Sequence, residues 1–183
     1  MSEHYLRPLL APRNVALVGA SERAGSLGRI VYRNLAEGGL RGELFPVNPK
    51  HTAVFGKRAF ARLTELPAPV DLAVVATPAS TVPGILEDAV RAGVGAAVVL
   101  TSGFAESGDE GRRLQQQALA AAGGRVRILG PNCLGLIRTD CGLNATFART
   151  GALPGPLALV SQSGAICTAV LDWARGAGIG FSS

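Results

Sequence analysis

The chain has 183 residues, the size of one ordinary domain or of one domain with part of a second. Hydrophobic residues make up 48% of it, which is enough for a packed core and too much for a disordered segment. The formal net charge of +5 comes from scattered arginines and two lysines, so it fits an anionic small molecule as well as nucleic acid, or a composition bias without function. Aromatic residues make up only 5%, which argues against a surface that stacks single-stranded nucleic acid.

The cysteines, Cys133, Cys141 and Cys167, are too few and too widely spaced for a disulfide framework. No paired Cys or His spacing indicates zinc, and no apolar run approaches the roughly 18 residues of a membrane span. Residues 1–13 have no apolar core of a signal peptide. We therefore expect a cytoplasmic protein with no metal and no membrane contact.

Short apolar runs alternate with segments of helical periodicity. The runs are continuously apolar, as in parallel strands that helices cover on both faces. Five βα units of this kind predict an α/β fold with a Rossmann-like, doubly wound parallel sheet. The expected strands are residues 14–19, 43–48, 71–76, 95–100 and 126–129, and the expected helices are 28–39, 80–92 with Ser80 as N-cap, and 109–122.

A second α/β pattern follows the first. Residues 136–156 show no clear periodicity and are predicted to be a linker. A strand over 157–161 and a helix over 165–175 then follow, and another strand begins at 181–183. We expect a first domain of residues 1–150 and the beginning of a second, truncated α/β domain in residues 151–183.

Glycine is the outlier of the composition: 24 glycines are about 13% of the chain, near twice the usual share of roughly 7%. Three of them, Gly19, Gly25 and Gly28, form a loop between the first strand and the first helix. Glycines at this place let the backbone approach a phosphate, which free N–H groups of the helix then bind. The spacing G-x5-G-x2-G is longer than that of a simple dinucleotide site and favours a larger phosphate group, or else a turn without a ligand.

The residue that follows the second predicted strand indicates which phosphate-bearing ligand is favoured. An NAD site has an acidic residue there, about 20 residues after the loop, which binds the ribose hydroxyls. This chain has Lys50 at that place, and a lysine cannot accept from hydroxyls but attracts a ribose phosphate. NADP or coenzyme A is therefore favoured, unless Lys50 is a solvated turn residue. No group suited to hydride transfer stands out, which weakens NADP.

Three further loops are predicted at the same edge of the sheet: residues 77–79, 101–106 and 130–135. In open α/β sheets, ligands bind in the crevice at the carboxyl ends of the strands. Thr101 and Ser102 are suited to hydrogen-bond an amide-bearing arm such as pantetheine, and Pro78 to form an apolar wall. Ordinary turn chemistry explains these loops equally well.

Taken together, the segments resemble the CoA-binding domain of the NDP-forming acyl-CoA synthetases, the superfamily of the succinyl-CoA synthetase α subunit and the ADP-forming acetyl-CoA synthetases. They occur in the family's order over nearly the whole chain. Asn144-Ala-Thr-Phe147 and Leu171-Asp-Trp-Ala174 also resemble the fused GNAT protein-lysine acetyltransferases. The segments that match the synthetases are the glycine loop, Pro46-Val-Asn-Pro-Lys50, Thr77-Pro-Ala79, Thr101-Ser-Gly103, Gly130-Pro-Asn-Cys-Leu-Gly135 and Val160-Ser-Gln-Ser-Gly164.

The resemblance implies a site for CoA or acyl-CoA. The glycine loop binds a CoA phosphate, Lys50 the nucleotide end, the next two loops the pantetheine arm, and Asn132 and Cys133 lie near the thiol. A second site, at a helix N-terminus, binds the phosphate of a phosphohistidine or acyl phosphate. The implied CoA-binding residues are Gly19, Ser21, Gly25, Ser26, Leu27, Gly28, Lys50, Thr77, Pro78, Ala79, Thr101, Ser102, Gly103, Asn132 and Cys133, and the phosphate-binding residues are Ser161, Gln162, Ser163, Gly164 and Ala165.

The family's reaction exchanges acyl-CoA, phosphate and NDP for carboxylate, CoA and NTP through a phosphorylated histidine. Only His4 and His51 are present, and neither has the family's position. Thr168 stands where some relatives carry a tyrosine, and Cys133 fits a turn residue better than a nucleophile. We therefore expect no catalytic residue in this chain and no turnover by it alone.

Three parent proteins are compatible with these features. The first is an NDP-forming ligase, which implies an ATP-grasp domain or subunit as its partner and is compatible with a homo-oligomer. The second is a GNAT acetyltransferase with an acetyl-CoA-sensing domain. The third, with least weight, is an NADP-dependent oxidoreductase. None of them predicts a nucleic-acid partner.

Overall fold

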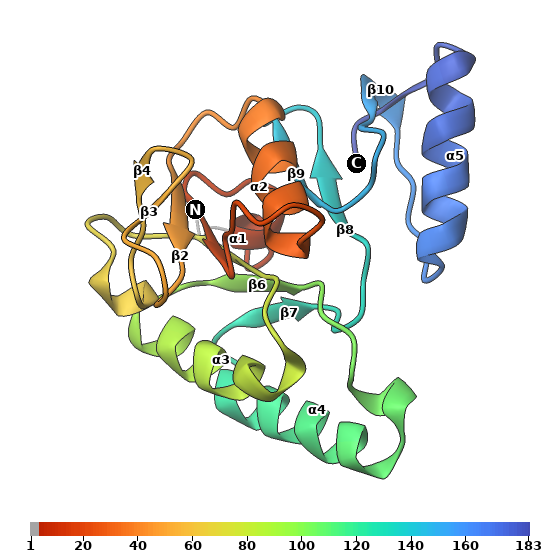
Figure 1. Ribbon diagram of the computed structural model, residues 1–183. Helices are drawn as coiled ribbons and strands as arrows, with labels where there is room; N and C mark the ends of the chain where they lie inside the picture. The colour runs from red at the N-terminus through yellow and green to blue at the C-terminus, as the bar shows by residue number, and fades with distance from the viewer. Residues whose placement is uncertain (1–3) are drawn as a thin grey trace.

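A computed structural model describes residues 4–183, and a five-stranded parallel sheet lies at its centre (Figure 1). The strand order is β2-β1-β5-β6-β7, and each neighbouring pair is in parallel register. This is the flavodoxin-like variant of the doubly wound fold, so the predicted fold class is confirmed. The strands are β1 (Val15–Val18), β2 (Leu44–Val47), β5 (Leu72–Val75), β6 (Ala96–Val99) and β7 (Arg127–Leu129).

Alternate residues of these strands pack into two cores on opposite faces of the sheet. On one face, Ala16, Ala73 and Ala97 lie in a cluster with α3 (Val82–Arg91) and α4 (Asp109–Ala122). On the other face, the intervening residues pack against α2 (Leu27–Glu37). Burial on both faces explains why the strands are apolar at every position rather than at alternate ones.

Two of the five predicted βα units are wrong, because only β1, β5 and β6 are followed by a helix of the expected kind. After β2 the chain forms the small hairpin of β3 (Ala53–Val54) and β4 (Lys57–Arg58), and then the 3₁₀ turn η1 (Leu63–Glu65). After β7 it enters a loop that leads to β8 (Gly135–Arg138). Both replacements are short segments without helical periodicity. The remaining short helices are α1 (Arg7–Leu10), η2 (Ala79–Thr81) and η3 (Ala105–Ser107).

The predicted linker over 136–156 is also wrong. Its first half forms an antiparallel hairpin of β8 and β9 (Leu143–Thr146). The hairpin lies against α2, and Leu143 and Ala145 are buried there. The amide of Asn34 in α2 donates to the carbonyl oxygens of Thr146 (2.8 Å) and Ala148 (3.0 Å). Two strands of four residues are too short to show a reliable alternation, so the sequence did not reveal them.

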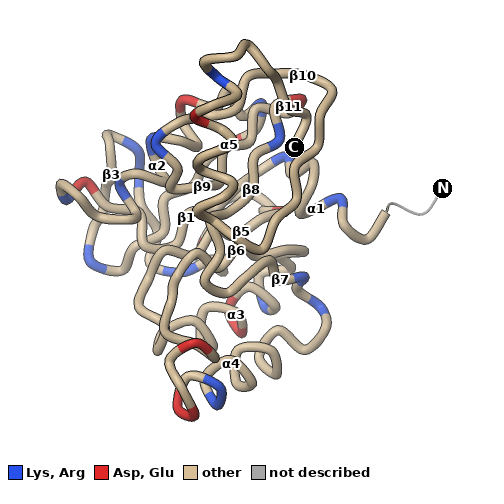
Figure 2. Tube along the Cα trace, turned by 90° about the vertical axis from the view of Figure 1, so that its right-hand side faces the viewer, with Lys and Arg blue, Asp and Glu red and all other residues tan. Residues whose placement is uncertain are grey.

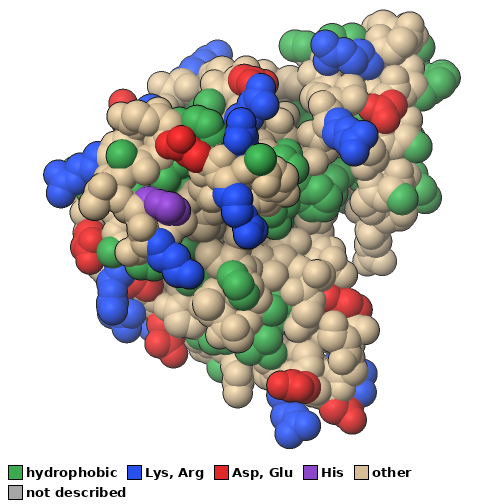
Figure 3. All heavy atoms as spheres, in the orientation of Figure 1, with side chains coloured by type: hydrophobic (Ala, Val, Ile, Leu, Met, Phe, Trp, Pro, Cys, Tyr) green, Lys and Arg blue, Asp and Glu red, His purple; other side chains and the backbone are tan. Residues whose placement is uncertain are grey.

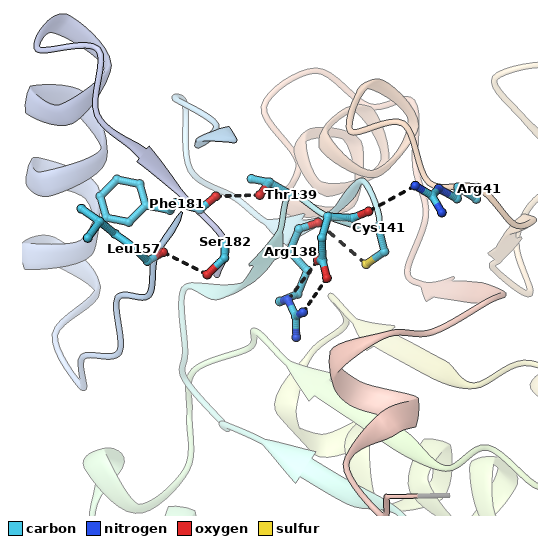
Figure 4. Close-up of polar contacts among 8 residues, drawn as sticks. Arg41, Arg138, Thr139, Cys141, Leu157, Phe181 and Ser182 are labelled. Atoms are coloured by element: carbon cyan, nitrogen blue, oxygen red, sulfur yellow. Dashed lines mark hydrogen bonds and ion pairs between the residues drawn. The ribbon is translucent and has the colours of Figure 1, made fainter. Parts of the chain in front are cut away.

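The second α/β pattern forms a small C-terminal unit of β10 (Leu153–Leu157), α5 (Gly164–Gly176) and β11 (Gly180–Phe181), with β10 and β11 parallel. The strand expected over 157–161 therefore lies earlier, in a segment whose two prolines indicated a loop. In Figure 4, this unit is joined to the hairpin, because the Thr139 hydroxyl donates to the carbonyl of Phe181 at 2.6 Å. The unit projects from the body of the molecule, with an open notch beneath the N-terminal end of α5 (Figure 3).

Two helix ends show how local residues set the helix bounds. Gly39 has a φ of +82° just past the end of α2, as a glycine that stops a helix does. Ser80 is not an N-cap, because η2 precedes α3 and moves the start of the helix to Val82. In the described part of the chain, no helix has the length and apolar character that crossing a bilayer requires.

We expect the two-sided core to respond to truncation according to burial. Leu86 in α3 is fully buried, whereas Leu119 in α4 is 53% exposed. Leu86→Ala should lower the free energy of unfolding by about 2–5 kcal/mol through lost burial and a cavity. Leu119→Ala is the matched control and should change it by less than about 0.5 kcal/mol. Urea unfolding measures both values, and equal losses would contradict the core described here.

Candidate functional site

The strand order places a topological switch point, where a ligand crevice is expected, at one edge of the sheet. The chain leaves β1 toward β2 on one side and returns to β5 on the other, so the connections that follow β1 and β5 diverge. In open α/β sheets this reversal opens a ligand crevice outside the carboxyl ends of the strands. The predicted loops 19–28, 77–79, 101–103 and 130–135 follow β1, β5, β6 and β7 in turn, so all four lie at this edge.

The glycine loop has the conformation of an anion-binding turn. Ser26 is the N-cap of α2, and its hydroxyl oxygen accepts from the N–H of Arg29 at 3.3 Å. Its hydroxyl donates to the carbonyl of Arg23 at 2.8 Å, which folds the loop back on itself. Within the described residues, the N–H groups of Leu27 and Gly28 make no hydrogen bond. These free donors at a helix N-terminus are the groups that bind a phosphate.

Gly19 and Gly28 are required by close backbone contact. A Cβ on Gly28 would lie 1.9 Å from the carbonyl oxygen of Gly19, so only glycine lets α2 start this near to β1. Gly19 has a φ of +92°, and a Cβ there would lie 2.8 Å from Cγ2 of Thr77. Gly25 has a φ of +72° but open space around it, so its backbone conformation alone favours glycine.

Asn48 connects the end of β2 to the glycine loop. Its side-chain N–H group donates to the carbonyl of Ala20 at 2.8 Å, and its side-chain oxygen accepts from the N–H of Lys50 at 2.9 Å. The exposed Lys50 is thereby placed in a turn that is bonded to the loop. The sequence predicted Lys50 as a phosphate ligand and placed Asn48 in a family motif, but these two hydrogen bonds of Asn48 were not predicted.

The loops after β5, β6 and β7 contact one another in sequence. The Thr101 hydroxyl donates to the carbonyl of Thr77 at 2.6 Å, and the N–H of Asn132 donates to the carbonyl of Thr101 at 3.0 Å. Asn132 has a φ of +54°, in the left-handed region that Asn tolerates better than most residues. Pro78 and Ala79 begin the turn into α3, and the hydrogen bonds hold the loops after β5, β6 and β7 side by side at this edge of the sheet.

Two acidic residues that the sequence analysis did not single out fix the loops from outside. Glu106 accepts from the N–H groups of Gly103 (2.6 Å) and Phe104 (3.2 Å). Partial burial acts to raise the pKa of Glu106, but these backbone hydrogen bonds lower it overall. Glu22 accepts from the N–H of Phe55 at 2.5 Å and connects the glycine loop to the β3–β4 hairpin. The residues next to Glu22 and Glu106 form no local pattern that indicated either contact.

Cys133 is poorly suited to be a nucleophile. Its thiol points to the carbonyl oxygens of Val99 (3.4 Å) and Leu129 (3.7 Å), inside the turn that follows β7. Burial raises the pKa of this thiol to about 11, although backbone N–H groups partly oppose the shift. With this pKa the thiol is almost fully protonated near pH 7. The reactive form is the thiolate, so little of it is present. The geometry agrees with a turn residue.

The second predicted phosphate site begins α5. Ser163 is its N-cap and accepts from the N–H of Ile166 at 3.3 Å, while the hydroxyl oxygen of Ser161 accepts from the N–H of Ser163 at 3.0 Å. A Cβ on Gly164 would lie 3.6 Å from the side chain of Leu134, so this helix start adjoins the loop after β7. Residues 161–165 therefore face the Asn132–Cys133 end of the crevice, whereas the glycine loop lies at β1.

The fold is doubly wound, and its loop edge is of the kind that binds phosphate-bearing ligands in such folds. Comparisons with known proteins make the class specific. The family described as "CoA binding domain" matches residues 13–139, and the "Succinyl-CoA ligase like flavodoxin domain" matches residues 154–183. The chain belongs to the CoA-binding domain family and corresponds to the N-terminal, CoA-binding α part of the ADP-forming acyl-CoA synthetases. The resemblance that the motifs indicated is thus confirmed.

The relatives give the extent of this similarity. The α subunit of acetate–CoA ligase [ADP-forming] I from Pyrococcus furiosus is 41% identical over 97% of this chain and 40% of its own length. The 4-hydroxybutyrate–CoA ligase [ADP-forming] from Nitrosopumilus maritimus is 36% identical over 96% of this chain and 26% of its own. The apo structure of the dinucleotide-forming acetyl-coenzyme A synthetase 1 from Ca. Korarchaeum cryptofilum has a TM-score of 0.91 at 36% identity, over 97% of this chain and 38% of that one. The chain thus spans less than half the length of these relatives, and they give no support to the acetyltransferase or oxidoreductase alternatives.

The close contact of Gly28 with Gly19 leads to a prediction about stability. Gly28→Ala should lower the free energy of unfolding by about 3 kcal/mol or more, because α2 must move away from β1. The matched control is Gly84→Ala in α3, where nothing lies within 4 Å of the new Cβ. It should be neutral or stabilising by up to about 1 kcal/mol, since alanine favours a helix. Thermal unfolding compares them, and a neutral Gly28→Ala variant would contradict the contact.

The raised pKa of Cys133 predicts slow alkylation. In a Cys141→Ser, Cys167→Ser variant, the rate of reaction with iodoacetamide should rise about tenfold per pH unit from pH 8 to 10 without a plateau, because the thiolate fraction grows until the pKa near 11. An unhindered cysteine would begin to level off near pH 8.5. Mass spectrometry of timed samples measures the rate, and a plateau below pH 9 would contradict the assignment.

Proposed function

We propose that this chain binds CoA and acyl-CoA at the crevice edge as part of an ADP-forming acyl-CoA ligase. The observation that carries this proposal is the convergence of four loops, each matching a family motif, on the switch point of a CoA-binding domain. The acyl group of acyl-CoA differs from one ligase of this class to another, whereas CoA is the ligand common to all of them.

The loops have separate roles along the ligand. The N–H groups of Leu27 and Gly28 bind a phosphate of the CoA pyrophosphate, helped by the positive end of α2. Lys50, in the turn bonded to the glycine loop by Asn48, pairs with the phosphate on the ribose. The pantetheine arm then follows the loops after β5 and β6 toward Asn132 and Cys133. CoA thus lies across the carboxyl ends of all the central strands.

The start of α5 holds the phosphate of a phosphohistidine or acyl phosphate in this proposal. The N–H groups of Gly164 and Ala165 make no hydrogen bond within the described residues, and the Ser163 cap leaves them at the helix end. Their place beside Leu134 brings the phosphate close to the thiol end of CoA. Attack of that thiol on an acyl phosphate, with release of phosphate, is the step that such a juxtaposition favours.

The nucleophilic histidine comes from outside these residues. His51 is exposed in the turn after Lys50, at the nucleotide end of the crevice, and is far along the chain from the start of α5. The chain by itself therefore binds CoA but does not complete the reaction. We propose that an ATP-grasp domain or subunit supplies nucleotide chemistry to the whole enzyme. Figure 2 shows the basic residues spread over many elements, which favours a small anion over a nucleic acid as partner.

Calorimetric titration tests the ligand. CoA should bind more tightly than dephospho-CoA, which lacks the ribose phosphate, and both should bind more tightly than NADP. The difference between the first two reports the phosphate contact, and the third ligand tests the oxidoreductase alternative. Absent CoA binding or tighter NADP binding would overturn the proposal.

The role of Lys50 has a built-in control, because Lys57 is the other of the two lysines in the chain. Lys50→Ala should weaken CoA binding by about 1–3 kcal/mol, the worth of a hydrogen bond to a charged group. The same variant should leave dephospho-CoA binding nearly unchanged. Lys57→Ala, on β4, should leave both affinities nearly unchanged. Equal effects of the two variants would show a general charge effect instead of a contact.

A further inference from the structure

The Thr101 hydroxyl donates to a backbone carbonyl that a backbone N–H would bind if the strand continued regularly. The ladder between β5 and β6 continues past the strands to the bond from the N–H of Leu100 to the carbonyl of Val75, at 3.1 Å. Parallel ladders space such bonds by two residues, so the next donor would be the N–H of residue 102 and the next acceptor the carbonyl of Thr77. The chain turns away there, and the side chain of Thr101 donates to that carbonyl instead, at 2.6 Å.

This bond joins the middle two of the four loops, and each is bonded or packed to its outer neighbour. The carbonyl of Thr101 accepts from Asn132, which fixes the loop after β7. On the other side, Thr77 occupies the space that the absent side chain of Gly19 leaves. The Thr81 hydroxyl also contacts the Thr77 hydroxyl (2.8 Å) and the carbonyl of Pro78 (2.7 Å), which orients the same loop.

The bond also limits what Thr101 offers to a ligand. A threonine hydroxyl has one proton to donate, and Thr101 donates it to the carbonyl oxygen of Thr77. Ser102 is exposed, and its hydroxyl makes no hydrogen bond within the described residues. Ser102 therefore retains the donor that an amide carbonyl of an extended arm requires.

We propose that Thr101 is a positioning residue, which sets the spacing between the 77–79 and 101–103 loops, and that Ser102 is the hydroxyl that contacts the pantetheine arm. This inference depends on the proposed CoA site and adds a division of labour between two neighbouring residues. It assigns the width of the crevice at its centre to one side-chain hydrogen bond. The phosphate end, at the glycine loop, is fixed independently by Ser26 and Asn48.

Affinities for CoA and for 3′,5′-ADP, which has the nucleotide end but no pantetheine arm, test the proposal. Thr101→Val keeps the shape of the side chain and removes the hydroxyl. It should weaken CoA binding about fivefold to tenfold, the equivalent of one hydrogen bond, and leave 3′,5′-ADP binding within about twofold. Thr101→Ser should restore CoA binding, because it retains the donor. Ser102→Ala should weaken CoA binding to a similar degree and leave 3′,5′-ADP binding unchanged.

Controls separate a local effect from a loss of structure. Thr64→Val removes a hydroxyl in η1 that donates to Asp88 of α3 and belongs to none of the four loops, so it should leave both affinities unchanged. If Thr101→Val does not fold, Thr101→Ala and Thr101→Ser give the same comparison, since they differ by the hydroxyl alone. A further readout is amide hydrogen exchange at Thr81 and Asn132, whose N–H groups donate to the carbonyls of Pro78 and Thr101 at 3.0 Å each. This exchange should be faster in Thr101→Val and unchanged in Ser102→Ala.

Distinct results would overturn distinct claims. Unchanged CoA affinity in Thr101→Val, equal losses for CoA and 3′,5′-ADP, or failure of Thr101→Ser to restore binding would each overturn the positioning role. Faster exchange at Thr81 or Asn132 in Ser102→Ala would overturn the division of labour between the two residues. Absence of CoA binding by the unmodified chain would overturn the proposed function itself, and the inference with it.

Discussion

The backbone contact between Gly28 and Gly19 is the constraint on which the whole crevice depends. It sets the distance between the first turn of α2 and the end of β1, at a separation that no side chain fits. A helix start this close to the strand leaves its free N–H groups at the sheet edge, where the other three loops end. A wider gap would move the anion-binding donors away from those loops. The proposed phosphate site is therefore a property of packing as much as of loop sequence.

Much of this arrangement was predictable from the sequence, for physical reasons. The strands of the central sheet are buried on both faces, so their runs of Val, Leu and Ala are unmistakable, and α4 lies at the predicted residues 109–122. The glycine loop was visible because glycine is required there sterically. The order of the loops along the chain followed from the fold class, since carboxyl ends of parallel strands share an edge.

The elements and contacts that the sequence did not reveal are short strands and hydrogen bonds to residues far along the chain. The strands β8 and β9 have four residues each and gain their stability from α2, more than one hundred residues away at Asn34. Strand β10 contains Pro154 and Pro156, which indicate a loop, and it exists because it pairs with β11. The bond from Thr101 to Thr77 connects two loops whose separation in space no local pattern records. The site residues were predicted by family motifs, whereas the contacts between them came only from the structure.

Helix α2 connects the glycine loop rigidly to the β8–β9 hairpin and to the C-terminal unit. Its first turn carries the free N–H groups, and near its last turn Asn34 is bonded to the β8–β9 hairpin. That hairpin in turn is bonded to the C-terminal unit through Thr139. An eleven-residue helix is a stiff rod of roughly 16 Å, so it does not absorb a displacement along its axis. The helix whose first turn is proposed to bind the anion is thus the same helix that holds the hairpin and, through the hairpin, the C-terminal unit.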